Sequence, residues 1–277
     1  MTPRALLLLS ARRLREAGVP DPDQDAAWML SFLTGQPPLL LRLDTETQLD
    51  EDTLNAFDAL LQRRKRREPL QYLLGSVSFH GLTFRTDPRA LIPRPETSLL
   101  ADWCLECLQN IPAPAVLDLC CGSGCIGLSL KAARPDLVLT MTDLSAEALS
   151  LARENAQTLQ LDAAFLQGDL FAPLSGAAFE LIVSNPPYIP SRDCETLQEE
   201  VRREPLLALD GGGDGLDFYR RIAAEAPGHL RPGGQLLMEL GDGEAQAVRT
   251  LLHRGGAVRT EIRADLAGVD RMIRAVY

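Results

Sequence analysis

The part of the chain from about residue 97 to the end alternates short apolar runs with amphipathic ones. We expect strands at 115–119, 137–142, 163–167, 179–184 and 235–240, and helices at 124–133, 146–160, 218–226 and 244–254. Apolar strands that alternate with helices predict a mainly parallel sheet covered on both faces. Two more apolar runs, 257–263 and 271–276, follow each other without a helix. The expected fold is therefore α/β, with an antiparallel strand at the edge of the sheet or inserted in it.

The first 73 residues have a different pattern. The segments "RALLLLSARRLREAG", "DQDAAWMLSFLTG" and "DEDTLNAFDALLQRRKRR" carry apolar residues at helical spacing, with Asp, Gly or Pro at their ends. We therefore expect a small all-helical domain over 1–73. Apolar residues around His80-Gly81 predict a β-hairpin linker over 74–96, in which Pro93 and Pro95 end a following strand. The α/β domain then covers 97–277.

The charge of the chain limits its partners. Its 277 residues carry a formal net charge of −10 at pH 7. Affinity for nucleic-acid phosphates needs a basic face, so we expect no direct specific binding to nucleic acid. The basic run at 63–67 is a local exception, which we interpret as a solvated helix end, with a contact for an acidic partner as the alternative.

The sequence gives no sign of a membrane segment or of a metal site. Four consecutive leucines at 6–9 are too few for the apolar region of a signal peptide, and no stretch approaches the ~20 apolar residues of a membrane span. We therefore expect a cytoplasmic protein without membrane contact. Cys104 and Cys107 form a CxxC with no second pair at ligand spacing, so we expect free thiols and no metal.

A glycine-rich turn follows the first strand of the α/β part. "VLDLCCGSGCIGLSL", residues 116–130, has the order strand, tight loop, helix, and Gly122, Gly124 and Gly127 satisfy G-x-G-x-x-G. In dinucleotide sites such glycines bring the ligand to the helix N-terminus. Methyltransferases that bind S-adenosylmethionine use a similar turn, so the motif leaves the cofactor open.

Acidic residues near the ends of three strands bear on that choice. Asp118 precedes the loop, where a carboxylate would oppose a pyrophosphate but pair with the ammonium of S-adenosylmethionine. Asp143 is placed to accept hydrogen bonds from both ribose hydroxyls of either cofactor. Asp169 could accept from an adenine amino group, with Leu170 and Phe171 as apolar cover.

The fourth strand ends in "SNPPY", residues 184–188. Pro186 and Pro187 make a stiff turn, because proline fixes φ and has no N–H. The Asn185 Oδ1 atom and the Pro186 carbonyl can then both accept from one planar –NH2 group, while Tyr188 offers a ring face. Two oriented acceptors would free the lone pair of a conjugated nitrogen toward an electrophilic methyl group. The motif therefore predicts methyl transfer to an amide or exocyclic nitrogen.

Four segments resemble the peptide chain release factor glutamine methyltransferase family: "REPLQYLLG", "LIPRPET", "NPPYI" and "EVRREPLLALDGGGDGLDFYRRI". The resemblance covers nearly the whole chain. It implies a helical N-terminal domain, a hairpin linker and a Rossmann-like catalytic domain that binds S-adenosylmethionine. It also implies transfer of a methyl group to the side-chain amide nitrogen (N5) of the glutamine in the Gly-Gly-Gln tripeptide of release factors, which are then the protein partners.

The resemblance and the residue chemistry together give the expected site. Asn185, Pro186 and Tyr188 are the expected catalytic residues, and these three with Pro187 are expected to bind the target glutamine. The expected cofactor-binding residues are Asp118, Cys120, Cys121, Gly122, Ser123, Gly124, Asp143, Asp169, Leu170 and Asn185. Cys120 departs from the glycine common in the family, and a positive φ there would strain it.

Several alternatives remain open at this point. Related enzymes that methylate a glutamine of a ribosomal protein also have a cysteine at the start of the loop. Nucleic-acid adenine N6-methyltransferases share the Asn/Asp-Pro-Pro-Tyr/Phe motif, but the acidic charge disfavours them. A nicotinamide-dependent dehydrogenase would leave the two prolines unexplained. A non-enzymatic binder of translation factors requires the motif to be vestigial. We expect partner recognition by 1–73 and 192–215.

Overall fold

The computed structural model describes residues 1–277 and divides into two compact units. The first, which we call the helical unit, comprises Met1–Ser76 and Gln198–Arg203. The second, which we call the sheet unit, comprises Val77–Leu197 and Glu204–Tyr277. A short segment from the second half of the sequence thus belongs to the helical unit.

The helical unit has five helices around one apolar core. They are α1 (Pro3–Glu16), α2 (Pro22–Thr34), α3 (Pro38–Leu43), α4 (Glu51–Lys65) and α5 (Leu70–Leu74). Leu14, Leu30 and Phe57 are among the buried core residues that the periodic pattern supplies. The sequence pattern predicts α1, α2 and α4 but misses α3 and α5. Those two helices have six and five residues and begin directly after a proline, so they are too short to show a helical period.

The basic run at the end of α4 is only partly solvated. The Arg64 Nε atom donates to Asp25 Oδ2 at 2.7 Å, and its Nη1 atom donates to Glu200 Oε1 at 2.8 Å. Arg67 Nε also donates to Glu200 Oε1, at 2.6 Å. Burial opposes the charge, but hydrogen bonds from Arg67 and Arg64 hold the pKa of Glu200 at about 2. The expected solvated helix end is therefore wrong for Arg64 and Arg67, whose acidic partners belong to this chain.

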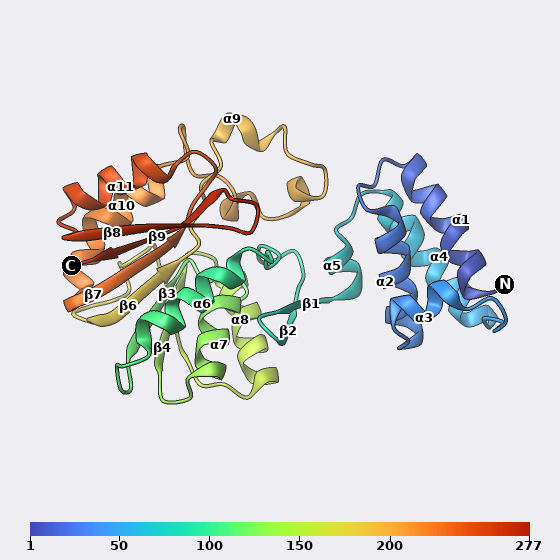
Figure 1. The fold of residues 1–277 in the computed structure, drawn as a ribbon, viewed down its shortest axis with the longest axis horizontal. Helices are drawn as coiled ribbons and strands as arrows, with labels where there is room; N and C mark the ends of the chain where they lie inside the picture. Colours follow the sequence, from blue (N-terminus) through green and yellow to red (C-terminus); the bar gives the residue numbers. More distant parts are fainter. The chain divides into compact units, whose positions relative to one another are not determined.

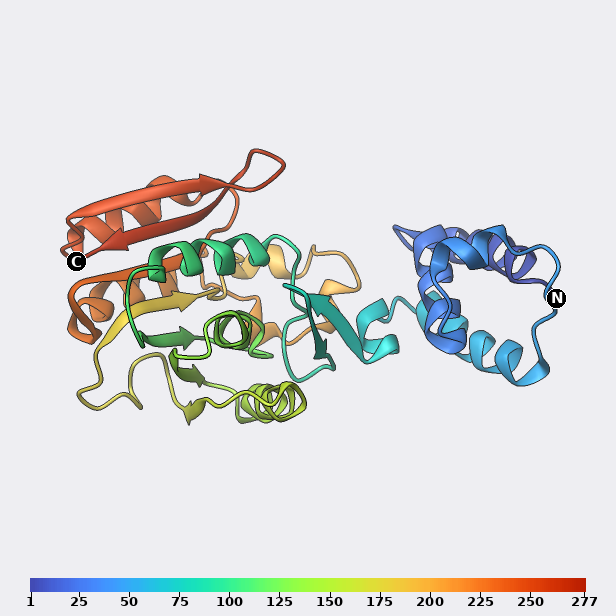
Figure 2. The same cartoon turned by 60° about the horizontal axis from the view of Figure 1, so that its bottom comes forward.

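The sheet unit contains a seven-stranded sheet in the order β5-β4-β3-β6-β7-β9-β8 (Figure 1). Its strands are β3 (Ala115–Leu119), β4 (Val138–Asp143), β5 (Ala164–Gln167), β6 (Phe179–Ser184), β7 (Leu230–Glu239), β8 (Arg259–Ala264) and β9 (Asp270–Val276). The first five are parallel to one another, and β9 runs antiparallel between β7 and β8. Figure 2 shows β8 and β9, in red, as one hairpin at the end of the chain. The expected α/β fold with an inserted antiparallel strand is confirmed.

Helices cover both faces of this sheet and form a separate apolar core with each face. The longer helices are α6 (Thr97–Leu108), α7 (Cys125–Ala133), α8 (Ala146–Leu159), α10 (Asp217–Glu225) and α11 (Ala245–Arg254). The first three contribute Trp103, Leu128 and Leu149 to one core, whereas α10 and α11 contribute Ile222 and Val248 to the other. A sheet buried on both faces leaves its strand ends as the place for a site.

The linker and the long loop hold the remaining elements. These are the hairpin strands β1 (Ser76–Phe79) and β2 (Leu82–Arg85), helix α9 (Ser191–Cys194) and the 3₁₀ turns η1 (Val201–Arg203), η2 (Leu206–Ala208) and η3 (Ala226–His229). His80 and Gly81 have φ values of 48° and 76°, as a two-residue type I′ turn requires. The strand expected before Pro93 is absent. Residues 86–96 contain only turns and irregular backbone, since prolines cannot donate to a ladder.

Candidate active site

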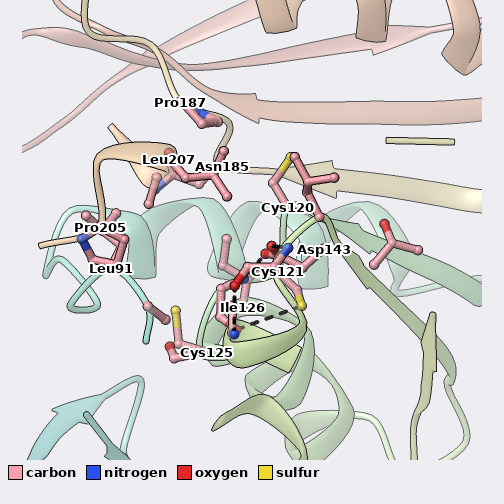
Figure 3. Close-up of a pocket in the computed structure, with 18 of the residues that line it drawn as sticks. Leu91, Cys120, Cys121, Cys125, Ile126, Asp143, Asn185, Pro187, Pro205 and Leu207 are labelled. Carbon is pink, nitrogen blue, oxygen red and sulfur yellow. Dashed lines mark hydrogen bonds between the residues drawn. The ribbon is translucent and has the colours of Figure 1, made fainter. Parts of the chain in front are cut away.

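A cavity of about 110 Å³ lies at the carboxyl ends of β3, β4, β5 and β6 (Figure 3). It is lined by residues from 89–97, the glycine loop at 120–126, the end of β4 at 142–148, the turn at 168–170, and 205–208, together with Asn185, Pro187 and Phe218. A water-sized molecule needs roughly 10–15 Å³ in such a measure, so the cavity has room for a ligand of many atoms. Ligands of open α/β sheets bind at this edge.

The glycine loop forms one wall through an unusual backbone path. Cys120, Gly122 and Gly124 have φ values of 60°, 55° and 83°. The loop is held by hydrogen bonds from the Cys121 N–H to the Thr142 carbonyl at 3.0 Å and from the Gly124 N–H to the Cys121 carbonyl at 2.8 Å. Cys120 therefore occupies a left-handed conformation that favours glycine and costs a residue with a side chain about 1 kcal/mol or more.

Two glycines of the loop are also required by packing. A Cβ atom on Gly124 would lie 2.9 Å from Met141 Cε and 3.1 Å from Leu128 Cδ1. A Cβ atom on Gly127 would lie 2.8 Å from Asp118 Oδ2. Helix α7 thus approaches β3 and β4 more closely than any side chain would allow, and its N-terminus reaches the cavity.

Asp143 stands at the end of β4 and lines the cavity. Its Oδ2 atom accepts from the Gly122 N–H at 2.8 Å, and its Oδ1 atom accepts from the Ser145 N–H at 2.9 Å. Burial raises the pKa of this carboxyl, and the two backbone donors oppose the rise. Each oxygen keeps acceptor capacity, so the carboxylate can receive the two hydroxyls of a ribose.

Asp118 does not line this cavity. Its side chain is buried beneath the loop, with Oδ2 accepting from the Gly127 N–H at 2.8 Å and Oδ1 without a hydrogen-bond partner. Burial raises its pKa to about 7, against the hydrogen bond from Gly127. The structure thus gives no direct contact between Asp118 and a ligand's ammonium, because the strand directs the side chain toward α7. Gly124 likewise lies outside the lining.

Asp169 and Leu170 both reach the cavity, with different surroundings. The Asp169 side chain is half exposed and its Oδ2 atom lies 2.8 Å from Arg221 Nη2. An adenine amino group would share that carboxylate with a guanidinium. Leu170 has a φ of 48° and is buried in the core beside Phe171, so it offers an apolar edge to the cavity.

The Asn-Pro-Pro-Tyr turn directly follows β6. The Ser184 Oγ atom donates to the Leu119 carbonyl at 2.7 Å, which ties the last residue of β6 to β3. Asn185 and Pro187 line the cavity (Figure 3). Pro186 and Tyr188 are not among the lining residues. The Tyr188 hydroxyl instead donates to Glu239 Oε1 at 3.3 Å. Burial raises the pKa of Tyr188, so it is a neutral phenol.

A second glycine-rich loop supports this turn, and its role was not expected from the sequence. A Cβ atom on Gly211 would lie 2.7 Å from Tyr188 Cα, and one on Gly215 would lie 2.5 Å from the Tyr188 carbonyl oxygen. Ile189 also exchanges hydrogen bonds with this loop, to the Leu209 carbonyl at 2.9 Å and from the Gly211 N–H at 2.8 Å. The glycines at 211–215 thus let the loop pack directly on the backbone that follows the prolines.

Residues 89–94 and 205–208 are the other lining segments that residue chemistry alone did not indicate. Residues 91–94 and 205–208 lie in stretches with family resemblance, "LIPRPET" and "REPLLALDGGGDG", which was the only available signal; Arg89 and Ala90 lie just before the first of them. They contribute mainly apolar side chains and proline rings, among them Leu91, Ile92, Pro205 and Leu207. These two segments therefore add mainly apolar surface to the cavity wall.

No group of three or more His, Cys, Asp or Glu residues in the structure could hold a metal ion. All six cysteines are free, and Cys104 of the CxxC is buried in the core. No helix has both the length and the apolar composition that crossing a bilayer demands.

Two family profiles match the chain. The family described as "PrmC N-terminal domain" matches residues 5–75, and "Methyltransferase small domain" matches residues 101–216. Among curated relatives, the release factor glutamine methyltransferase of Deinococcus radiodurans is 46% identical over 98% of this chain and 97% of the relative. That of Geobacter sulfurreducens is 42% identical over 94% of this chain and 91% of the relative.

Solved structures agree on the fold. A methyltransferase from Pyrococcus furiosus aligns with 71% of this chain and 89% of its own, at a TM-score of 0.52 and 17% identity. At that identity the likeness concerns the fold alone.

Proposed function

The chain belongs to the family of release factor glutamine methyltransferases, and from that premise we propose that it methylates the side-chain amide nitrogen (N5) of the glutamine in the Gly-Gly-Gln tripeptide of peptide chain release factors. The methyl donor is S-adenosylmethionine. One observation carries the proposal: Asn185, Pro187, the glycine loop and Asp143 all line the same cavity. The amide-holding motif and the cofactor-type loop thus share one space.

The residues divide into two groups along the cavity. We assign the cofactor to the loop at 120–123, to Asp143 for the ribose and to Asp169 and Leu170 for the adenine. The cofactor supplies an electrophilic methyl group on a sulfonium sulfur. Asp118 acts from beneath, because its bond to the Gly127 N–H fixes the start of α7.

The Asn-Pro-Pro-Tyr turn holds the acceptor. We assign the Asn185 Oδ1 atom and the Pro186 carbonyl oxygen as the acceptors of the two amide protons of the target glutamine. Holding both protons directs the nitrogen lone pair to one side, and orientation of this kind contributes up to ~7–11 kcal/mol to a transfer step. The Tyr188 ring would cover the amide plane, with its hydroxyl tethered to Glu239.

Recognition of the protein partner is assigned to the helical domain 1–73 and to residues 192–215, with 74–96 as linker and 97–277 as catalytic domain. Helices α1, α2 and α3 of the helical unit expose seven large apolar side chains: Leu8, Leu9, Trp28, Phe32, Leu39, Leu40 and Leu43. Exposed apolar groups gathered on three helices are typical of a protein-binding surface. Release factors act on ribosomes, so the proposed place of work is the cytoplasm.

Replacing Asn185 tests the assignment. Asn185→Ala removes one of two acceptors, so we expect kcat for release-factor methylation to fall by about 10²–10³-fold. The Kd for S-adenosylmethionine, measured by calorimetry, should stay within about threefold, since most cofactor contacts remain. Asn185→Asp keeps an acceptor oxygen and should retain more activity than Asn185→Ala.

The surface variant Asn110→Ala serves as the matched control, because Asn110 is exposed and lies outside the cavity. Full turnover by Asn185→Ala would exclude the proposed role of the motif.

A further inference from the structure

Glu204 is a buried carboxylate that the assigned site does not use. Only 5% of the residue is exposed. Its Oε2 atom accepts from the backbone N–H of Ile92 at 2.9 Å, and its Oε1 atom accepts from Arg94 Nη2. A buried carboxylate is costly unless it is paired and hydrogen-bonded, and here both oxygens have a partner.

Both hydrogen-bond partners of Glu204 belong to the walls of the cavity. Ile92 and Arg94 line the cavity, as does Pro205, the residue that follows Glu204. The chain separation between Glu204 and Ile92 is 112 residues, so this one side chain joins two distant segments. In the view of Figure 3, Leu207 lies beside Asn185, Leu91 and Pro205 lie on one side of it, and Asp143 lies on the other.

Secondary structure does not hold the first of these walls. Residues 91–94 are irregular backbone that contains Pro93 and is followed by Pro95, and so they have neither a helix nor a ladder to fix them. The buried N–H of Ile92 needs an acceptor, which Glu204 supplies. A carboxylate suits this place, because it accepts at both oxygens, whereas a glutamine amide would present an –NH2 group to one of two donors.

We propose that Glu204 is a positioning residue that holds residues 91–94 against 205–208 and thereby shapes the end of the cavity where the acceptor glutamine enters. The inference rests on the proposed function, since it concerns the acceptor of that reaction. The proposal distinguishes the two ends of the cavity: the shape of the acceptor end depends on Glu204, and the shape of the cofactor end does not.

The test compares Glu204→Gln with the wild-type enzyme and with Glu225→Gln, an exposed glutamate of α10 that lies outside the cavity lining and outside residues 192–215. Misplacing a wall by a fraction of an ångström to 1 Å should lower kcat/KM for the release factor by about 10–100-fold. The Kd for S-adenosylmethionine should change less than twofold, and Glu225→Gln should match the wild type in every measurement. Equal losses of cofactor affinity and methyl transfer would indicate a merely structural role and overturn the proposal.

Hydrogen exchange of the Ile92 amide gives a readout that needs no substrate. It should become faster in Glu204→Gln, and unchanged exchange would also overturn the proposal. If the wild-type enzyme fails to methylate release factors, the proposed function fails, while the exchange result still decides the role of Glu204 in the cavity wall. If Glu204→Gln does not fold, Arg94→Ala is the variant to measure. It keeps the hydrogen bond between Glu204 and Ile92, so its loss of kcat/KM should be smaller than the one expected for Glu204→Gln. Its affinity for the cofactor should again be unchanged.

Discussion

At the scale of single residues, Asp118 shows how burial creates a pH dependence. Its pKa is raised to about 7 in the folded protein, because it is buried, against about 3.9 for an unfolded chain. Between these values the folded state holds a proton that the unfolded state has released. The free energy of unfolding should therefore fall as the pH rises from about 4 to about 7 and stay level above that range.

Asp118→Asn should flatten this dependence, because the amide does not titrate and its oxygen can still accept from Gly127. The fall in the free energy of unfolding between pH 4 and pH 7 should become smaller in the variant, by on the order of a few kcal/mol. Urea unfolding at several pH values, without cofactor, measures it. Glu244, whose pKa burial also raises to about 7, supplies a slope that remains in the variant. An unchanged slope would mean that Asp118 is already ionised in the folded protein.

At the scale of elements, the junction of β3, the glycine loop and α7 depends on the absence of a side chain at Gly124. Gly124→Ala combines a φ of 83° with a Cβ atom 2.9 Å from Met141 Cε. We expect a loss of about 2–4 kcal/mol in the free energy of unfolding, the sum of strain and overpacking. Cofactor affinity should weaken at the same time, because α7 would move away from the sheet.

Gly268→Ala is a matched control for that variant. Gly268 has a φ of 84° with no atom within 4 Å of an added Cβ. It should lose only about 1–2 kcal/mol, the cost of the left-handed conformation alone. Equal losses in the two variants, by urea unfolding, would rule out the packing argument.

Those parts of the fold and of the candidate site that depend on local patterns could be predicted from the sequence. The strands and the glycine turn were predictable because periodicity and turn chemistry act over a few neighbouring residues. Asp118 was expected at the cofactor, but its side chain direction depends on how closely Gly127 brings α7 to β3. The wall at residues 91–94 depends on Glu204, and no local pattern reports a contact across 112 residues.

At the scale of the whole molecule, the two compact units carry different expected tasks. Trp28 and Phe32 are 43% and 54% exposed and are four residues apart on α2, so they share one face of the helix. Truncating both to alanine should weaken release-factor binding by at least about tenfold, as is typical of exposed aromatic anchors. The Kd for S-adenosylmethionine, whose proposed site lies in the sheet unit, should not change.

Leu266→Ala provides the comparison for that double variant, since Leu266 is 96% exposed in the sheet unit. It should bind both ligands like the wild type. Undiminished affinity of the double variant for release factors, measured by calorimetry, would remove α2 from the recognition surface.

The most direct test of the account is tandem mass spectrometry of a purified release factor after incubation with the enzyme and S-adenosylmethionine labelled in its methyl group. A ribosomal protein and an adenine-containing oligonucleotide serve as parallel substrates. We predict one labelled methyl group, on the amide nitrogen of the Gly-Gly-Gln glutamine, and none on the other two substrates. Label on the ribosomal protein or on adenine, with an unmodified release factor, would contradict it.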